Sequence, residues 1–198
     1  MKIVIFNLKG GQGKTSIAVN LALTLNAGII TNDVYSPLES VLSQNQFIRI
    51  EKDEEFPDID ESNSINIYDL GGWIDERAIG LFKEADLIIV PMINSFLDNQ
   101  TTINTLEEVK KYNDRVIIVV NRTTKNDFAE AKSLMENFYK KDEFVFFEIK
   151  QTTAFKKIFE KTKSINSIME EDKLLAYSYR ELQQQFQQIV DFIKNIEE

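Results

Sequence analysis

The sequence predicts an α/β fold with a mostly parallel, doubly wound sheet that is flanked by helices. Short apolar runs alternate with helical patterns along the chain, as expected for parallel strands joined by helices. The runs are apolar throughout rather than at every second residue, which is typical of strands buried on both faces. A chain of 198 residues with 43% hydrophobic content can bury one substantial core. We therefore expect a single domain over residues 1–198.

The predicted elements follow one another in a regular order. The expected strands cover about 3–6, 29–31, 65–68, 87–91, 116–121 and 144–147. The expected helices cover about 17–25, 38–42, 76–84, 99–112, 127–139, 154–161 and 174–196. Gly28 is well placed to stop the first helix, because glycine commonly ends helices. The segment 32–64 has the least regular pattern.

Composition excludes several classes of chemistry. The chain has no cysteine and no histidine, which excludes disulfides, thiolate metal sites and the commonest general base. The apolar runs are strand-sized and the N-terminus starts the first strand, so we expect no membrane span, no export leader and a cytoplasmic location. A formal net charge of −9 argues against a broadly basic surface but leaves room for a local basic patch.

A glycine-rich loop joins the first strand to the first helix. Gly10, Gly11 and Gly13 lie between the apolar run 3–6 and the helical pattern 17–25. Glycine allows the backbone to turn its N–H groups inward around an anion. The first turn of the following helix adds unpaired N–H groups and the positive end of the helix dipole. The loop is therefore predicted to bind phosphate.

The side chains after the loop suit a magnesium-bound nucleotide. Lys14 can reach the β- and γ-phosphates, and the hydroxyl of Thr15 can complete the shell of a bridging Mg²⁺. Ser16 can add a donor near the α-phosphate. Asp69 follows an apolar strand and precedes two glycines, which suits a carboxylate that approaches Mg²⁺ or its bound water, although a strand-end Asp that caps the next turn fits the same pattern.

The loop resembles a known motif. The run Lys9-Gly10-Gly11-Gln12-Gly13-Lys14-Thr15-Ser16 is similar to the deviant Walker A motif of the ParA/MinD family of P-loop ATPases. Leu8 stands where the commoner P-loop pattern has its first glycine. In the family, the extra lysine, which corresponds to Lys9, reaches across a nucleotide-sandwich dimer to the ATP of the partner subunit.

The resemblance implies further site residues. Asp69 matches the carboxylate near Mg²⁺, and Gly71 and Gly72 match the loop that senses the γ-phosphate. The family's second strand usually ends in two carboxylates that position the attacking water and the Mg²⁺ shell. Here Thr31 and Asp33 occupy those places, so Asp33 either carries this role alone or only forms a turn.

Two other strand ends match the family pattern. Asn121 and Arg122 follow a strand and correspond to the pair that frames the adenine, although an ordinary loop-start asparagine fits as well. Pro91 and Asp98 match the family's loop after a strand, where dimer contacts form.

These features predict a ParA-type partition ATPase. Such a protein binds and slowly hydrolyses MgATP, dimerises with ATP, associates with nucleoid DNA and works with a centromere-binding partner protein on plasmid or chromosome cargo. One alternative is a MinD-like ATPase on a membrane surface, but the last helix ends in acidic residues rather than in a basic amphipathic tip. Another is a binding module with little turnover, because of Thr31. A metabolic or metal-insertion relative would be expected to have cysteines or a substrate domain.

A lysine cluster is the candidate DNA surface. Within residues 150–163, Glu160 is the single acidic residue. The candidate DNA-binding residues are Lys150, Lys156, Lys157, Lys161 and Lys163, with Arg180 expected nearby. A solvated lysine face explains the pattern about as well.

Overall fold

The computed structural model describes residues 1–57, 59 and 64–197. Its strands are β1 (Lys2–Ile5), β2 (Gly28–Thr31), β3 (Phe47–Arg49), β4 (Asn66–Asp69), β5 (Leu87–Met92), β6 (Val116–Thr123) and β7 (Val145–Lys150). Its helices are α1 (Lys14–Leu25), the 3₁₀ turn η1 (Leu38–Ser40), α2 (Glu76–Glu84), α3 (Phe96–Val109), α4 (Asp127–Phe138), α5 (Ala154–Lys161), α6 (Ile165–Glu171) and α7 (Lys173–Glu197).

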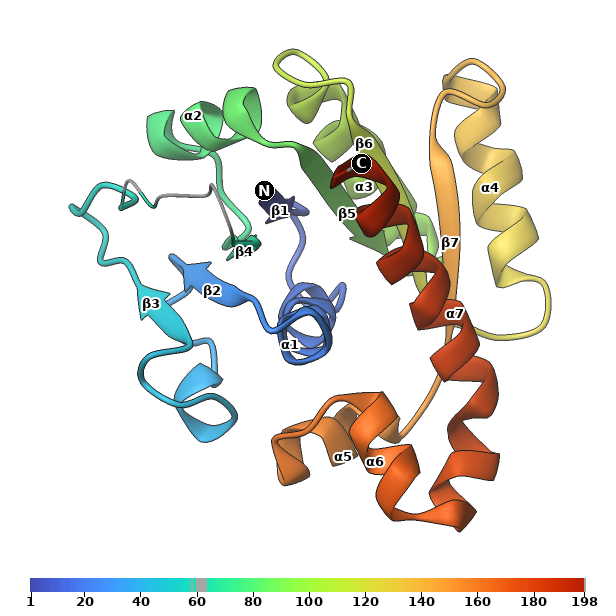
Figure 1. Cartoon of the computed structure of the whole chain (residues 1–198). Helices are drawn as coiled ribbons and strands as arrows, with labels where there is room; N and C mark the ends of the chain where they lie inside the picture. Colours follow the sequence, from blue (N-terminus) through green and yellow to red (C-terminus); the bar gives the residue numbers. More distant parts are fainter. Residues whose placement is uncertain (58, 60–63, 198) are drawn as a thin grey trace.

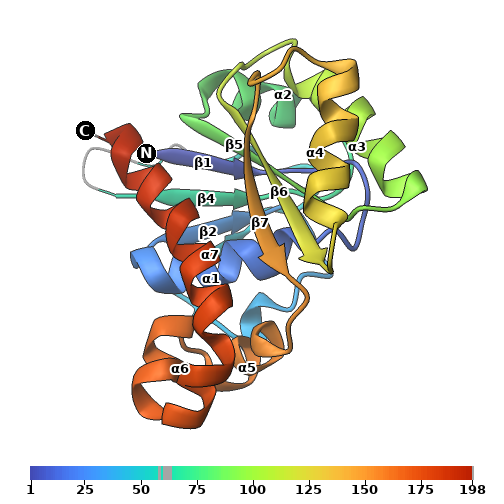
Figure 2. The same ribbon diagram turned by 90° about the vertical axis from the view of Figure 1, so that its right-hand side faces the viewer.

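The strands form one sheet in the order β3-β2-β4-β1-β5-β6-β7, and every pairing within it is parallel. Figure 2 shows β1, β4 and β2 side by side and pointing the same way. In register, Asp69 at the end of β4 lies opposite Ile5 of β1 on one side and Thr31 of β2 on the other. The carboxyl ends of these strands therefore meet at one edge of the sheet. The predicted doubly wound α/β fold is confirmed.

Two apolar layers cover the two faces of the sheet. One core joins the sheet to α1, α5, α6 and α7, and the other joins it to α2, α3 and α4. Figure 1 shows α4 and α7 on opposite sides of β7. Alternate residues of β1 divide between the layers: Ile3 and Ile5 belong to the first core, and Val4 belongs to the second. Burial on both faces explains why the strands are apolar throughout.

Several local features differ from the sequence prediction. Helix α3 lies about three residues earlier than the predicted 99–112, and the predicted helix 38–42 is the short 3₁₀ turn η1. Strand β3 lies in the segment predicted to be irregular; its three residues are too few to show a pattern, and Ile48 is exposed. Helix α6 is a further short helix, which begins where the side chain of Ser164 accepts a hydrogen bond from Ser167 N. Helix α1 ends at Asn26 in the left-handed conformation (φ 53°), so Gly28 is the first residue of β2 rather than the helix stop.

Candidate functional site

The glycine loop has the backbone geometry of an anion cradle. Gly11 and Gly13 adopt left-handed conformations with φ of 80° and 95°, which glycine reaches without strain. Gly13 precedes the first turn of α1, which has neither a side-chain cap nor an acidic residue. A Cβ at Gly13 would lie 2.1 Å from Nδ2 of Asn121, so this position requires glycine for its close packing too. The N–H groups of the turn are left for an anion.

Lys14 lies beneath this loop. Its side chain is largely buried, and its Nζ donates to the backbone carbonyls of Asn7 at 3.1 Å and of Lys9 at 3.2 Å. Burial lowers the pKa of the Lys14 ammonium, while the charges of Asp69 and Asp33 oppose that shift. An ammonium has three donors, so a third remains for a phosphate.

Thr15 and Asp69 meet where α1 faces the end of β4. The Thr15 hydroxyl donates to Oδ2 of Asp69 at 2.7 Å. Asp69 is 1% exposed, and its other oxygen, Oδ1, is buried with no hydrogen-bond partner in the described part of the chain. Burial raises the pKa of Asp69 to about 6, although the hydrogen bond from Thr15 and the charge of Lys14 act in the opposite direction. A buried carboxylate oxygen without a partner is a position that a cation would stabilise.

At the end of β2, the hydroxyl of Thr31 is already used in hydrogen bonds within the protein. It donates to the backbone carbonyl of Asp69 at 2.8 Å and accepts from Asp33 N at 3.1 Å. Thr31 therefore holds two strand ends together. Asp33 Oδ1 accepts from Tyr35 N at 3.0 Å, so the predicted turn is present. Asp33 also lies close enough to Lys14 and Asp69 to influence their pKa values.

The loop after β4 is held by a residue that the sequence prediction missed. Asn32 Oδ1 accepts from Gly71 N at 2.7 Å, and Asn32 Nδ2 is buried without a partner among the described residues. The ring of Trp73 covers Gly71, because a Cβ there would lie 2.1 Å from Trp73 Cζ3. A Cβ at Gly72 would lie 2.5 Å from the carbonyl oxygen of Leu8. Both glycines are thus needed for close packing against the P-loop and Trp73.

A family model described as the CobQ/CobB/MinD/ParA nucleotide binding domain matches residues 3–165 of this chain. The matched range contains the glycine loop, the carboxylates at the strand ends and Asn121. The chain belongs to the CobQ/CobB/MinD/ParA family. By sequence, no curated protein matches it.

Solved structures of CobQ/CobB/MinD/ParA type share the fold. An ATP complex of a McdA variant from Cyanothece has a TM-score of 0.66 at 16% identity, over 98% of this chain and 96% of that chain. A ParA family ATPase from Chlorobium tepidum has a TM-score of 0.60 at 16% identity, over 88% of this chain and 95% of that chain. MinD with Mg-ADP from Pyrococcus horikoshii has a TM-score of 0.58 at 14% identity, over 82% of this chain and 86% of that chain. At these identities the likeness shows the fold alone.

In this CobQ/CobB/MinD/ParA-type domain, Lys9 is held within its own chain. Its Nζ lies 2.7 Å from Oδ1 of Asp98. Gln12 Nε2 donates to the same oxygen at 2.8 Å, Gln12 Oε1 accepts from Ile93 N at 2.8 Å, and the Ser95 hydroxyl donates to Asp98 Oδ2. Burial raises the pKa of Asp98, but the hydrogen bonds from Lys9, Ser95 and Gln12 outweigh it, so this pKa lies below its usual value.

A buried asparagine supports the start of the P-loop. Asn7 Nδ2 donates to the carbonyl of Pro91 at 2.8 Å and to the Thr102 hydroxyl at 3.1 Å. Its Oδ1 accepts from Lys9 N at 2.9 Å and from the Thr105 hydroxyl at 3.3 Å. The sequence prediction missed this network. The sequence features that could have indicated this network are a polar residue directly after an apolar strand and the threonines on the buried face of α3.

Asn121 packs under the P-loop and lines a hollow beside it. It is 2% exposed, its Nδ2 donates to the Gln12 carbonyl at 2.9 Å, and its Oδ1 accepts from Arg122 N at 2.9 Å. Arg122 is exposed and has a positive φ of 55° at a bulge in β6. The predicted contact of Asn121 with adenine stays a prediction, and its observed contacts position Gln12.

The candidate DNA-binding residues lie at the end of β7, on α5 and just after α5: Lys150, Lys156, Lys157, Lys161 and Lys163. Besides Glu160, the fold brings two further carboxylates to them, Glu181 from α7 and Glu171 from α6. Lys150 pairs with Glu181, and Lys163 pairs with Glu171. Glu160 approaches two lysines of α5, at 2.8 and 3.7 Å. The cluster is therefore less positive than the local sequence suggests.

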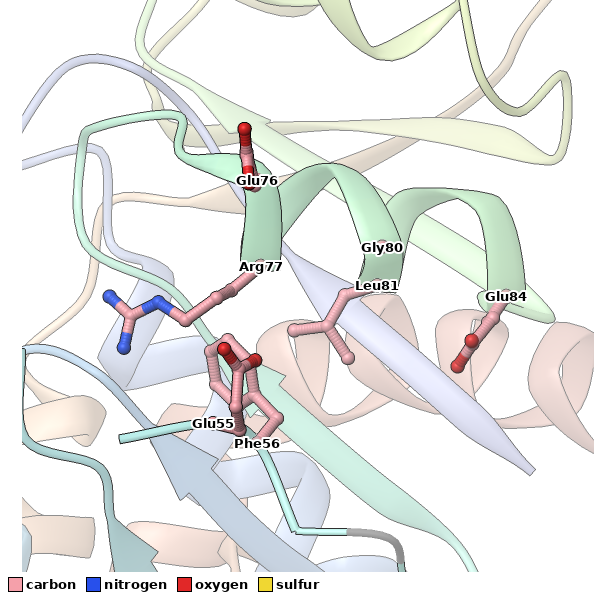
Figure 3. Close-up of a pocket in the computed structure, with 7 residues that line it drawn as sticks. All are labelled: Glu55, Phe56, Glu76, Arg77, Gly80, Leu81 and Glu84. Atoms are coloured by element: carbon pink, nitrogen blue, oxygen red, sulfur yellow. The ribbon is translucent and has the colours of Figure 1, made fainter. Parts of the chain in front are cut away.

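A hollow of about 330 Å³ lies beside α2, and no residue of the P-loop lines it. Three of its lining residues are acidic, Glu55, Glu76 and Glu84. Figure 3 shows Glu76 pointing away from the other two carboxylates. The described residues contain no group of three or more acidic side chains placed to hold a metal ion. We assign no site to this hollow.

Proposed function

We propose that this chain is a ParA-type partition ATPase. It binds MgATP, hydrolyses it slowly and forms an ATP-dependent sandwich dimer. The dimer binds DNA without sequence preference and works with a centromere-binding partner protein to segregate plasmid or chromosome cargo. The observation that carries the proposal is the meeting of Lys14, Thr15 and Asp69 beside an uncapped helix N-terminus at one edge of the sheet.

The donor set at this edge fits Mg²⁺. The Thr15 hydroxyl and the carboxylate of Asp69 are oxygen ligands of the kind that Mg²⁺ prefers, and Asp69 Oδ1 is a buried oxygen without a partner in the described chain. Thr15 would hold the ion directly, and Asp69 would hold it directly or through a bound water. When bound, the ion neutralises charge on the β- and γ-phosphates. Asp33 is the carboxylate available to orient the attacking water.

Phosphate release from MgATP tests the enzymatic part of the proposal. We expect slow release by the wild-type protein, faster release with DNA and the partner protein, and loss of release in Asp33→Asn. ATP binding without release above the Lys14→Ala background would overturn the ATPase proposal and favour a binding module with little turnover.

Lys9 is predicted to act in dimerisation rather than in binding of ATP by the monomer. Its present partner is Asp98, and the neighbouring Phe96 and Leu97 are 86% and 67% exposed, as expected for a surface that meets another protein. In Lys9→Ala, we expect ATP affinity of the monomer to stay within about threefold of wild type, because Lys14 and the loop amides remain. ATP-dependent dimerisation should be lost. Calorimetry and sedimentation measure the two effects, and an equal loss of ATP affinity in Lys9→Ala and Lys14→Ala would contradict a trans-acting lysine.

Trp73 offers a direct readout of the loop that contains Gly71 and Gly72. The Gly71 N–H donates to Asn32 and the Trp73 ring covers Gly71, so a γ-phosphate that captures this N–H would displace the ring. We expect the fluorescence of Trp73, the single tryptophan, to change with MgATP or a non-hydrolysable analogue and to change less with MgADP. The Lys14→Ala variant should show neither change. Equal responses to both nucleotides in the wild type would argue against a γ-phosphate switch.

DNA binding is predicted to require ATP and to fall steeply with salt. If each subunit makes about three phosphate contacts, a dimer makes about six, and affinity should fall about a thousandfold between about 50 and about 200 mM salt. Fluorescence anisotropy with two unrelated duplexes measures affinity and sequence preference.

The α5 lysines carry this prediction, so Lys156, Lys157 and Lys161 should be changed to Glu together. We expect this triple variant to lose DNA binding while keeping ATP binding. A charge-matched control changes Lys111, Lys140 and Lys141, which follow α3 and α4 in the chain rather than belonging to α5, to Glu and should retain binding. DNA binding that survives the α5 changes would place the DNA surface elsewhere.

The MinD-like alternative has less support. The apolar stripe of α7 is buried in the core through Leu182, Phe186, Ile189, Val190 and Ile193, as the sequence analysis expected. Among the described residues, no helix combines the length and apolar content that crossing a membrane requires.

A further inference from the structure

A second hollow lies beside the P-loop at the carboxyl ends of β6 and β7. It has a volume of about 310 Å³, and its lining includes Ser16, Asn121, Arg122, Gln151, Thr152 and Phe155. Ser16 belongs to the first turn of α1. A nucleotide with its phosphates in the glycine loop would therefore place its nucleoside next to this hollow.

Among the described residues that line this hollow, Gln151 has a carboxamide that is free to read a base. Its backbone N donates to the Thr123 carbonyl at 3.0 Å, which fixes its position at the end of β7. Its side chain is exposed, and its carboxamide makes no hydrogen bond in the part of the chain that the structure describes. Asn121 differs, because its amide is buried and bonded to the Gln12 carbonyl and Arg122 N.

The other walls suit a planar ring. Phe155 lies in the first turn of α5, is partly buried against the core and lines the hollow, so its position is set by packing. An aromatic face stacks on any nucleobase, and the exposed guanidinium of Arg122 provides a second planar group. Lys150, which also lines the hollow, is paired with Glu181. Stacking on such planar groups does not by itself distinguish one purine from another.

We infer that Gln151 is the specificity-determining residue for the base, with Phe155 supplying the stacking face. This inference rests on the proposed function, since it assumes a nucleotide in the P-loop. A carboxamide has both a donor and an acceptor, so it can donate to N1 of adenine and accept from its N6 amino group. A carboxylate only accepts. It therefore loses the bond to adenine N1 but can accept from N1–H and the N2 amino group of guanine.

The test is calorimetric titration with MgATP, MgGTP and inorganic tripolyphosphate, which has no base. In Gln151→Glu, we expect the ratio of ATP to GTP affinity to fall at least about tenfold relative to wild type. In Gln151→Ala, we expect ATP affinity to fall about tenfold. Tripolyphosphate affinity should be unchanged in both variants. Gln188→Glu, an exposed change of the same charge on α7, should leave all three affinities unchanged.

The outcomes separate the two proposals. An unchanged ATP to GTP ratio in Gln151→Glu, or an equal loss of tripolyphosphate and ATP affinity in Gln151→Ala, would overturn the role of Gln151 while leaving the proposed function intact. A wild-type protein that binds neither ATP nor tripolyphosphate would overturn the proposed function itself.

Discussion

Replacing Lys14 with alanine is expected to lower ATP affinity by at least about a hundredfold, because it removes a positive charge beside the phosphates and the charge-assisted hydrogen bond that its third donor can make to them. The ammonium is already buried and held by the carbonyls of Asn7 and Lys9. The Lys14 side chain is therefore already ordered before the nucleotide binds, which lowers the entropy cost of binding. Phosphate release should fall to background in the same variant.

Calorimetry with MgATP measures this loss. The matched control is Lys132→Ala, which removes a partly exposed lysine of α4 whose neighbour Glu136 lies 3.8 Å away. The control should bind ATP like the wild type. Retention of ATP affinity within about threefold in Lys14→Ala would contradict the assignment of this loop as the phosphate site, since the expected loss is far larger.

Replacing Asp69 with asparagine is expected to reduce phosphate release by about a hundredfold or more, because a neutral amide holds the Mg²⁺ shell less well than a carboxylate. The Thr15 hydrogen bond can persist, since an amide oxygen accepts as a carboxylate oxygen does. The local structure should therefore remain. A release rate equal to wild type would remove Asp69 from the metal site.

The same variant should be more stable than wild type at high pH. Burial raises the pKa of Asp69 to about 6 from its ordinary 3.8, so the folded protein holds this proton more tightly than the unfolded chain. Below about pH 4, Asp69 is protonated in both states and its burial does not lower the free energy of unfolding. As pH rises through about 6, the buried carboxylate ionises and the free energy of unfolding falls. At about pH 8, Asp69→Asn should gain up to about 3 kcal/mol in free energy of unfolding, and almost nothing at about pH 4. Urea unfolding at both pH values measures the gain, and equal stability at pH 8 would contradict it.

The sequence predicted the parts of the fold whose physical signals are local. Apolar runs such as 87–91 must lie in a buried parallel sheet, and a glycine loop between strand and helix permits few other geometries. Asp69 could be placed at the correct edge, because carboxyl ends of parallel strands meet there. Helix α2 agrees with its predicted bounds, and the Asp75 side chain caps it by accepting from Ala78 N.

Contacts between distant segments could not be predicted in the same way. The partners of Lys9 and Gly71 are Asp98 and Asn32, which are 89 and 39 residues away along the chain. Nothing in the local pattern of either partner specifies such a contact. Glu181, which pairs with Lys150 across the β7–α7 packing, is a further example. Counting charges along a short segment misses charged side chains that lie next to it in the fold but belong to another helix or strand.

The most direct test of the central claim is the mass of the protein in solution with different nucleotides. Sedimentation equilibrium of the 22.9 kDa chain should give about twice that mass with a magnesium-bound, non-hydrolysable ATP analogue, and the monomer mass with MgADP. A monomer with both nucleotides at saturating concentrations, or the same dimer with both, would contradict an ATP-dependent sandwich dimer.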